Sequence, residues 1–257
     1  MLPASRGAAD HIDVLRAIET GIGETGFNVN VTSCDLSDAS MRIHLQARSV
    51  TMIATDLLAG YRSFGSEPVT YRHDTTGGAT YRVAQAQPSY PRTSYVRIGV
   101  RIAHSDTAAH DFEITPELVL ADDGLTLPLS THTFTHRWVH GTAGRPAVER
   151  NLAAIKALIR DTATQWLTAE YLDTTVRQLT EWAYVPITSA DLAATTCVEI
   201  GLDEVEAESV RAHFATDDRG RSRFDLALTI ATLARTTTDP ERSWMLADTA
   251  VQALTGP

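Results

Sequence analysis

A strict alternation of apolar and polar residues is the feature that most limits how this chain can fold. In residues 95–102 one alternate set is wholly apolar, whereas the other holds a tyrosine, a glycine and two arginines: Val96, Ile98, Val100 and Ile102 against Tyr95, Arg97, Gly99 and Arg101. Successive side chains of a strand point to opposite faces of a sheet. We therefore expect a strand with one face in the core and the other presenting Arg97 and Arg101 to solvent.

The same period of two recurs through the first half of the chain. Strand-like segments cover residues 27–34, 41–47, 77–87, 111–129 and 131–140, and helical spacing covers 10–22 and 50–61. Asp122-Asp123-Gly124 divides one of these segments with an Asp-Gly pair, which is a strong signal for a tight turn. Because the connections are too short for parallel crossovers, the pattern predicts a mostly antiparallel sheet with short helices.

The spacing becomes helical after Gly141. One apolar stripe continues to Trp166 and a second begins at Leu172, which predicts a long helix with a break or bend near Thr168–Asp173. The fold class is therefore α+β. We expect an α+β sheet domain over residues 1–145, a long helix over 146–186 and a small C-terminal helical region over 187–257.

The C-terminal region carries its own helix signals. Thr188 with Asp191, and Asp203 with Glu206, match the capping box that opens a helix. Two further helices are expected over residues 222–235 and 239–254.

Composition excludes several classes of protein. No apolar run approaches the roughly 18 residues of a membrane helix. The N-terminus has no apolar core of signal-peptide type, so we expect a cytoplasmic protein. Cys34 and Cys197 are in no CxxC context, which disfavours a thiolate zinc site and leaves a disulfide without support. The chain has no phosphate-binding loop, GxGxxG or GxSxG motif, so we expect a protein that is not an enzyme and needs no cofactor.

Tyrosine and arginine gather in one segment of an otherwise acidic chain. The net charge is −10, yet residues 61–101 hold six arginines against Glu67 and Asp74, a local charge of +4. The pair Tyr-Arg recurs there at intervals of ten residues, and the residues we assign to nucleic-acid binding are Tyr61, Arg62, Tyr71, Arg72, Tyr81, Arg82, Arg92, Tyr95, Arg97 and Arg101. Single strands are bound by arginines that contact phosphates and by aromatic faces on which bases stack. The alternative is a strand-rich segment with ordinary strand tyrosines and solvated arginines.

Three histidines, His132, His136 and His140, are spaced four apart in a strand-like segment. Residues four apart in a strand lie about 13 Å apart, too far to chelate one ion. We therefore expect no metal there, and a half-buried face shared with Phe134 and Trp138.

The run "YVRIGVRIAHSDTAAHDFEITPELVLADDGLTL", a further strand and a long helix together resemble the phage and plasmid-like family called domain of unknown function 932. Ser105, Pro116, Gly124 and Leu125 match a run typical of that family, but Ala121-Asp122-Asp123 stands where the family has Cys-x-Asn. The resemblance implies a role in phage replication, recombination or counter-defence. More distantly, the order of a small sheet and then a long helix resembles single-strand annealing proteins of phage recombination. Those proteins bind DNA in a basic groove between a β-hairpin and a helix and assemble as rings or filaments, which implies a homo-oligomer.

The sequence leads us to expect a phage-type, non-enzymatic protein of the host cytoplasm that binds and anneals single-stranded DNA. The alternative is an acidic protein that binds a host defence or replication factor through "GLDEVEAES" (201–209) and touches no DNA. A metal hydrolase built on the histidine strand ranks last.

Overall fold

The computed structural model describes residues 11–36, 40–58, 69–73, 80–84, 95–105, 112–120, 124–129, 132–137, 145–215 and 221–255. Its centre is an antiparallel sheet in the order β1-β2-β5-β6-β7, and β8 pairs with β6. The elements of this half are α1 (His11–Thr25), β1 (Val29–Leu36), β2 (Ser40–Ile53), β5 (Tyr95–Ser105), β6 (Phe112–Leu120), β7 (Leu125–Pro128) and β8 (Phe134–His136). The mostly antiparallel sheet expected from the sequence is confirmed.

The second half is helical, as expected, and this gives the α+β layout. Its elements are α2 (Arg145–Trp166), α3 (Ala169–Ala183), β9 (Pro186–Ile187), α4 (Ala190–Glu199), α5 (Glu204–Ala215), β10 (Arg221–Ser222), α6 (Arg223–Thr236) and α7 (Pro240–Thr255). The break predicted in the long helix is confirmed between α2 and α3, where the hydroxyl of Thr168 accepts a bond from the backbone N–H of Tyr171 and so caps α3.

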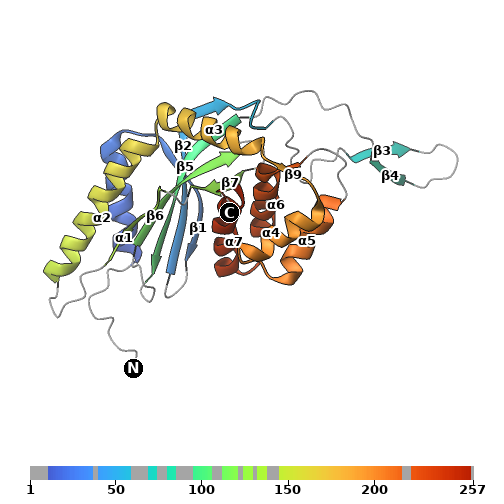
Figure 1. Ribbon diagram of the computed structural model, residues 1–257. Helices are drawn as coiled ribbons and strands as arrows, with labels where there is room; N and C mark the ends of the chain where they lie inside the picture. Colours follow the sequence, from blue (N-terminus) through green and yellow to red (C-terminus); the bar gives the residue numbers. More distant parts are fainter. Residues whose placement is uncertain are drawn as a thin grey trace.

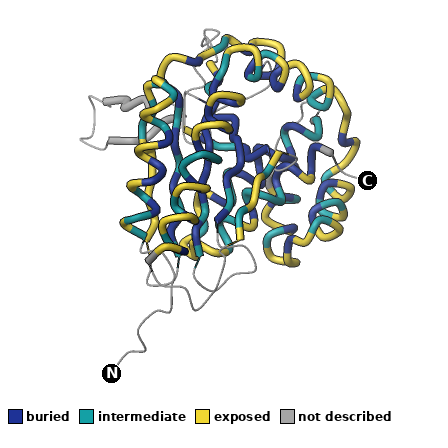
Figure 2. The backbone as a smooth tube through the Cα atoms, turned by 90° about the vertical axis from the view of Figure 1, so that its left-hand side faces the viewer, coloured by how far each residue is buried: buried dark blue, intermediate teal, exposed yellow. Residues whose placement is uncertain are grey.

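Helices cover both faces of the sheet (Figure 1). On one face His104 of β5 contacts His11 of α1, and α2 packs alongside α1. On the other face Arg101 of β5 bonds to Asp248 of α7. The buried hydrophobic residues form one continuous cluster that includes members of α1, the sheet and α7. The buried residues lie in the middle of the molecule and the exposed ones on its outside (Figure 2).

Two local expectations are wrong. Of the helix expected over residues 50–61, the described residues 50–58 are not helical, because β2 continues to Ile53, where it pairs with Tyr95, and a turn follows; residues 59–61 lie outside the described part. The β-branched Val50, Thr51 and Ile53 favour that strand. The helix α4 is capped by Ser189 rather than Thr188, whereas the box of Asp203 and Glu206 is confirmed by bonds in both directions.

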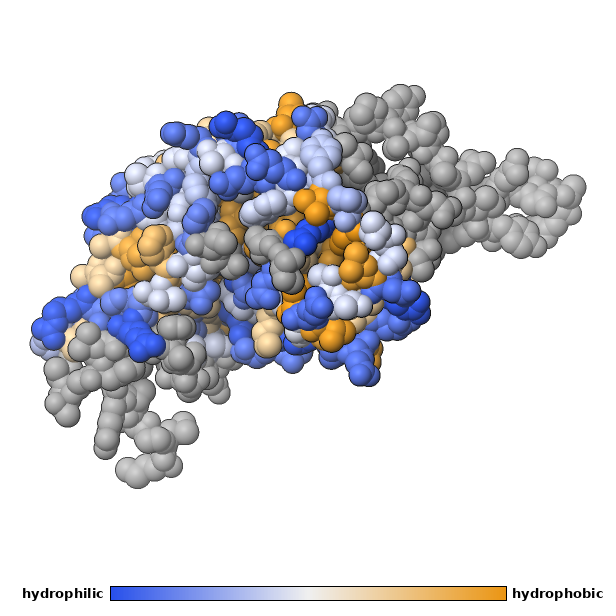
Figure 3. Space-filling view, in the orientation of Figure 1, coloured by the Kyte–Doolittle hydropathy of each residue, from blue (hydrophilic) through white to orange (hydrophobic). Residues whose placement is uncertain are grey.

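The described surface carries hydrophobic side chains in several separate groups within a mostly hydrophilic exterior (Figure 3). Among the described helices, none is long and apolar enough to cross a lipid bilayer.

Candidate functional site

The Tyr-Arg segment contributes a separate two-stranded sheet. Strand β3 (Val69–His73) pairs antiparallel with β4 (Thr80–Ala84). The register sets Tyr71 opposite Arg82 and Arg72 opposite Tyr81. The other members of the segment that the sequence assigned to DNA, Tyr61, Arg62 and Arg92, lie outside the described residues.

The arginine face expected on β5 is not a solvent face. Arg101 is 2% exposed, and its guanidinium makes an ion pair with Asp248 and lies over the ring of Trp244, 4.3 Å from the ring centroid. The prediction that Arg101 projects into solvent is therefore wrong. The physical reason is that α7 covers this face, so the alternation of β5 separates two buried faces rather than an inner and an outer one.

The first half of β5 is more open. Tyr95 is 40% exposed, and Arg97 is partly buried, with its Nε enclosed and without a hydrogen-bond partner. Of the candidate DNA residues on β5, Tyr95 is thus the most accessible and Arg101 the least.

Charged and titratable side chains of the sheet and of α7 meet between the two, and we call Arg42, His44, Arg101, Glu117 and Asp248 the charge layer. His44 Nδ1 lies 2.9 Å from a carboxylate oxygen of Glu117, whose side chain is 1% exposed. Burial alone lowers the pKa of His44, but the adjacent Glu117 carboxylate outweighs it, and the net pKa is raised. Burial also raises the pKa of Asp248, and Arg101 opposes that shift. Two ion pairs join the sheet to α7, Arg101 with Asp248 and Arg42 with Glu241, whereas His44 and Glu117 pair between two strands of the sheet.

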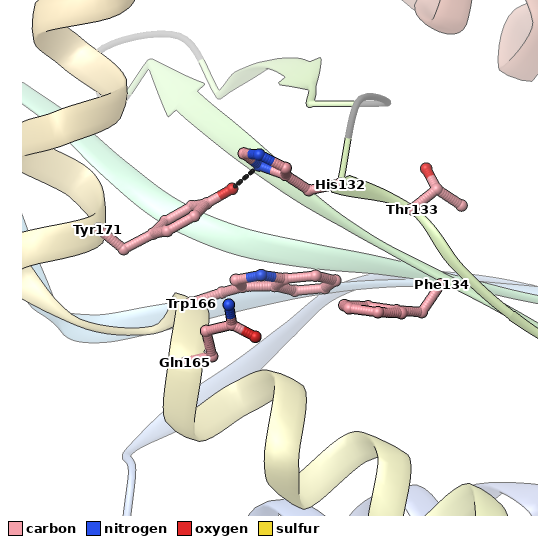
Figure 4. A pocket seen from close by; sticks show the side chains of 6 residues that line it. All are labelled: His132, Thr133, Phe134, Gln165, Trp166 and Tyr171. Atoms are coloured by element: carbon pink, nitrogen blue, oxygen red, sulfur yellow. Dashed lines mark hydrogen bonds between the residues drawn. The ribbon is translucent and has the colours of Figure 1, made fainter.

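A hollow of about 200 Å³ opens where β8 meets the break between α2 and α3 (Figure 4). We call it the aromatic slot, and it is lined by His132, Thr133, Phe134, Gln165, Trp166 and Tyr171. The break between α2 and α3 places two walls of the aromatic slot, because Trp166 is the last residue of α2 and Tyr171 lies in the first turn of α3.

The rings of the aromatic slot lie in two groups (Figure 4). Phe134 stacks on Trp166 with ring centroids 5.3 Å apart and an interplanar angle of 21°. His132 Nδ1 lies 2.6 Å from the hydroxyl of Tyr171. Burial raises the pKa of Tyr171 to about 12, so its phenol stays protonated.

The histidine segment differs in part from the expected strand. The strand β8 is limited to Phe134–His136, and His132 lies before it. His132 and Phe134 are exposed and His136 is partly buried, while Trp138 and His140 lie outside the described residues. Among the described residues, no three histidine, cysteine or acidic side chains are grouped so that they could hold a metal ion. Both cysteines are free, with Cys34 exposed and Cys197 buried.

Sequence reasoning missed the partners of His132 in the aromatic slot. Trp166 reads as one more member of an apolar stripe, and it is indeed 1% exposed. The predicted helix break was the one signal in the sequence. Trp166 and Tyr171 lie on either side of it, so both residues are near the corner between the two helices.

Comparison with known proteins adds no relative: no family model, no characterised protein and no solved structure matches this chain.

Proposed function

We propose that this protein binds single-stranded DNA through the β3–β4 hairpin and promotes strand annealing without enzymatic chemistry. The observation that carries the proposal is the register, in which Tyr71 stands opposite Arg82 and Arg72 opposite Tyr81. Opposite positions in an antiparallel pair share a face of the ribbon. Each face of the hairpin then combines one position for phosphate contact with one for base stacking, the two elements that single-strand binding uses.

The buried ion pair of Arg101 removes that residue from the proposed DNA contacts, and the hairpin and the exposed Tyr95 of β5 are the described candidates that support the proposal best. Annealing requires phosphate neutralisation and bases kept available for pairing. A role in phage recombination within the host cytoplasm, and assembly from several copies, belong to the same proposal and rest on the resemblance in layout to annealing proteins.

The alternative, a protein-binding surface on residues 201–209, receives less support from the charges there. Two of its four carboxylates are paired with arginines: Glu206 with Arg242 of α7, and Glu208 with Arg211. Asp203 and Glu206 also cap the start of α5. Within this stretch Glu206 ties α5 to α7 and Glu208 pairs within α5, so half of its carboxylates already have partners in the fold.

The test separates phosphate contacts from stacking. For Arg72→Ala and Arg82→Ala, the slope of log affinity against log salt should fall by about 0.7 per lost contact. For Tyr71→Ala and Tyr81→Ala, affinity for an oligothymidylate should fall by about 1–3 kcal/mol per stacked base while the slope stays nearly unchanged.

The matched control is Arg16→Ala, which removes an arginine whose side chain is 73% exposed on α1. It should leave both quantities unchanged. Absence of oligonucleotide binding by the intact protein at low salt refutes the proposal, as does an equal effect of the hairpin and control variants.

A further inference from the structure

We propose that the aromatic slot receives one unpaired base of the single strand, an inference that rests on the proposed DNA binding and assigns that strand a second contact site. The slot lies on the body of the protein at the junction of β8, α2 and α3, and so belongs to a different part of the chain from the β3–β4 hairpin.

The stacking surface is already formed. Trp166 is 1% exposed and is held in place by the core, whereas Phe134, stacked on it, is 44% exposed. An exposed ring supported by a buried one forms a rigid platform for a flat partner. The rings of Tyr171 and Trp166 lie 6.5 Å apart between centroids and tilted by 36°, and the hollow of about 200 Å³ lies against both of them and Phe134.

The polar groups of the slot match the edge of a base. The hydrogen bond between the Tyr171 hydroxyl and His132 Nδ1 leaves the second ring nitrogen of His132, Nε2, for a contact with a base edge. The Gln165 amide, exposed at the rim, supplies both a donor and an acceptor. The Thr133 hydroxyl already bonds to that of Thr115.

Size and charge restrict the occupant. The volume of about 200 Å³ is below the roughly 300 Å³ at which sites for drug-sized ligands begin, so it suits one ring system. The six lining residues include no lysine, arginine, aspartate or glutamate. A neutral heterocycle therefore fits the slot better than a phosphate does.

The experiment compares an oligothymidylate with an abasic oligomer of the same length, using the full chain and Phe134→Ala. The exposed Phe134 can be truncated with little risk to the fold, and Phe134→Tyr keeps a stacking ring. Phe134→Ala should lose about 5- to 150-fold in affinity for the oligothymidylate, the range for one stacked base, with an unchanged salt slope. It should bind the abasic oligomer as the wild type does, and Phe134→Tyr should retain wild-type affinity for both.

The matched control is Tyr184→Ala, which removes an aromatic ring that is 69% exposed outside the slot. If hairpin variants weaken binding but Phe134→Ala behaves like Tyr184→Ala, the slot inference is overturned and the proposed function stands. If no oligomer binds the intact protein, both are overturned. Equal losses of Phe134→Ala on the two oligomers overturn the assignment of the slot to a base.

Discussion

Replacing Asp248 with alanine should destabilise the protein strongly, because it leaves the guanidinium of Arg101 buried and unpaired. Arg101 is 2% exposed, and its Nε and Nη1 already lack hydrogen-bond partners. Removing one member of a buried ion pair costs about 3–5 kcal/mol. Since a third of the Asp248 side chain is exposed and water can reach it, we expect the lower end, about 3 kcal/mol.

The assay is urea unfolding followed by circular dichroism. With a slope of about 3 kcal/mol/M, a loss of about 3 kcal/mol lowers the midpoint by about 1 M. The double variant Arg101→Met/Asp248→Leu should recover most of the loss, because it removes both charges together with the two enclosed N–H groups.

A shift below about 0.5 kcal/mol for Asp248→Ala would refute the reasoning, since it would mean that α7 does not seal this face of the sheet. A double variant less stable than Asp248→Ala would also contradict it.

Three further predictions concern other parts of the fold. Gly99→Ala should destabilise by about 1–3 kcal/mol in the same unfolding assay, because the added methyl would lie 2.5 Å from the carbonyl oxygen of Leu45. The raised pKa of His44 means that its pairing with Glu117 stabilises fully below a pH of about 6.5 and is lost as pH rises through the folded-state pKa. Unfolding midpoints measured from below pH 6.5 to above the folded-state pKa of His44 should therefore depend less on pH in His44→Gln than in the wild type. Ser222→Ala removes the N-cap of α6 and should cost about 1 kcal/mol, whereas Ser222→Thr keeps a hydroxyl that can both accept from the Asp225 N–H and donate to its carboxylate and should retain most of the stability.

Much of the fold can be predicted from the sequence because the period of its apolar residues depends on local geometry. The strands of the central sheet and the break before Ala169 follow directly from that period. The prediction from this period is wrong for the segment after Ala47, because the apolar residues Val50, Ile53 and Leu57 also have the spacing of a helix. The segment is a strand because Ile53 pairs with Tyr95, a residue far along the chain that local spacing does not reveal.

The candidate sites were harder to predict, for a different reason. Alternation in β5 shows that the strand has two faces, but not whether a later helix covers the second one. Arg101 therefore looks solvated in the sequence, although Asp248 and Trp244 enclose it. The aromatic slot likewise depends on the meeting of Phe134 and Trp166, which no local spacing encodes.

The ion pair between Arg101 and Asp248 has a consequence for synthesis of the chain, because it joins residues 147 positions apart. The strands of the central sheet leave the ribosome long before α7 does. Until α7 arrives, Arg101 lacks the carboxylate and the ring that enclose it, and an incompletely covered sheet is prone to misassembly. Contacts this distant are also slow to form. A nascent chain halted before Pro240 would lack the Asp248 carboxylate and the Trp244 ring that enclose Arg101.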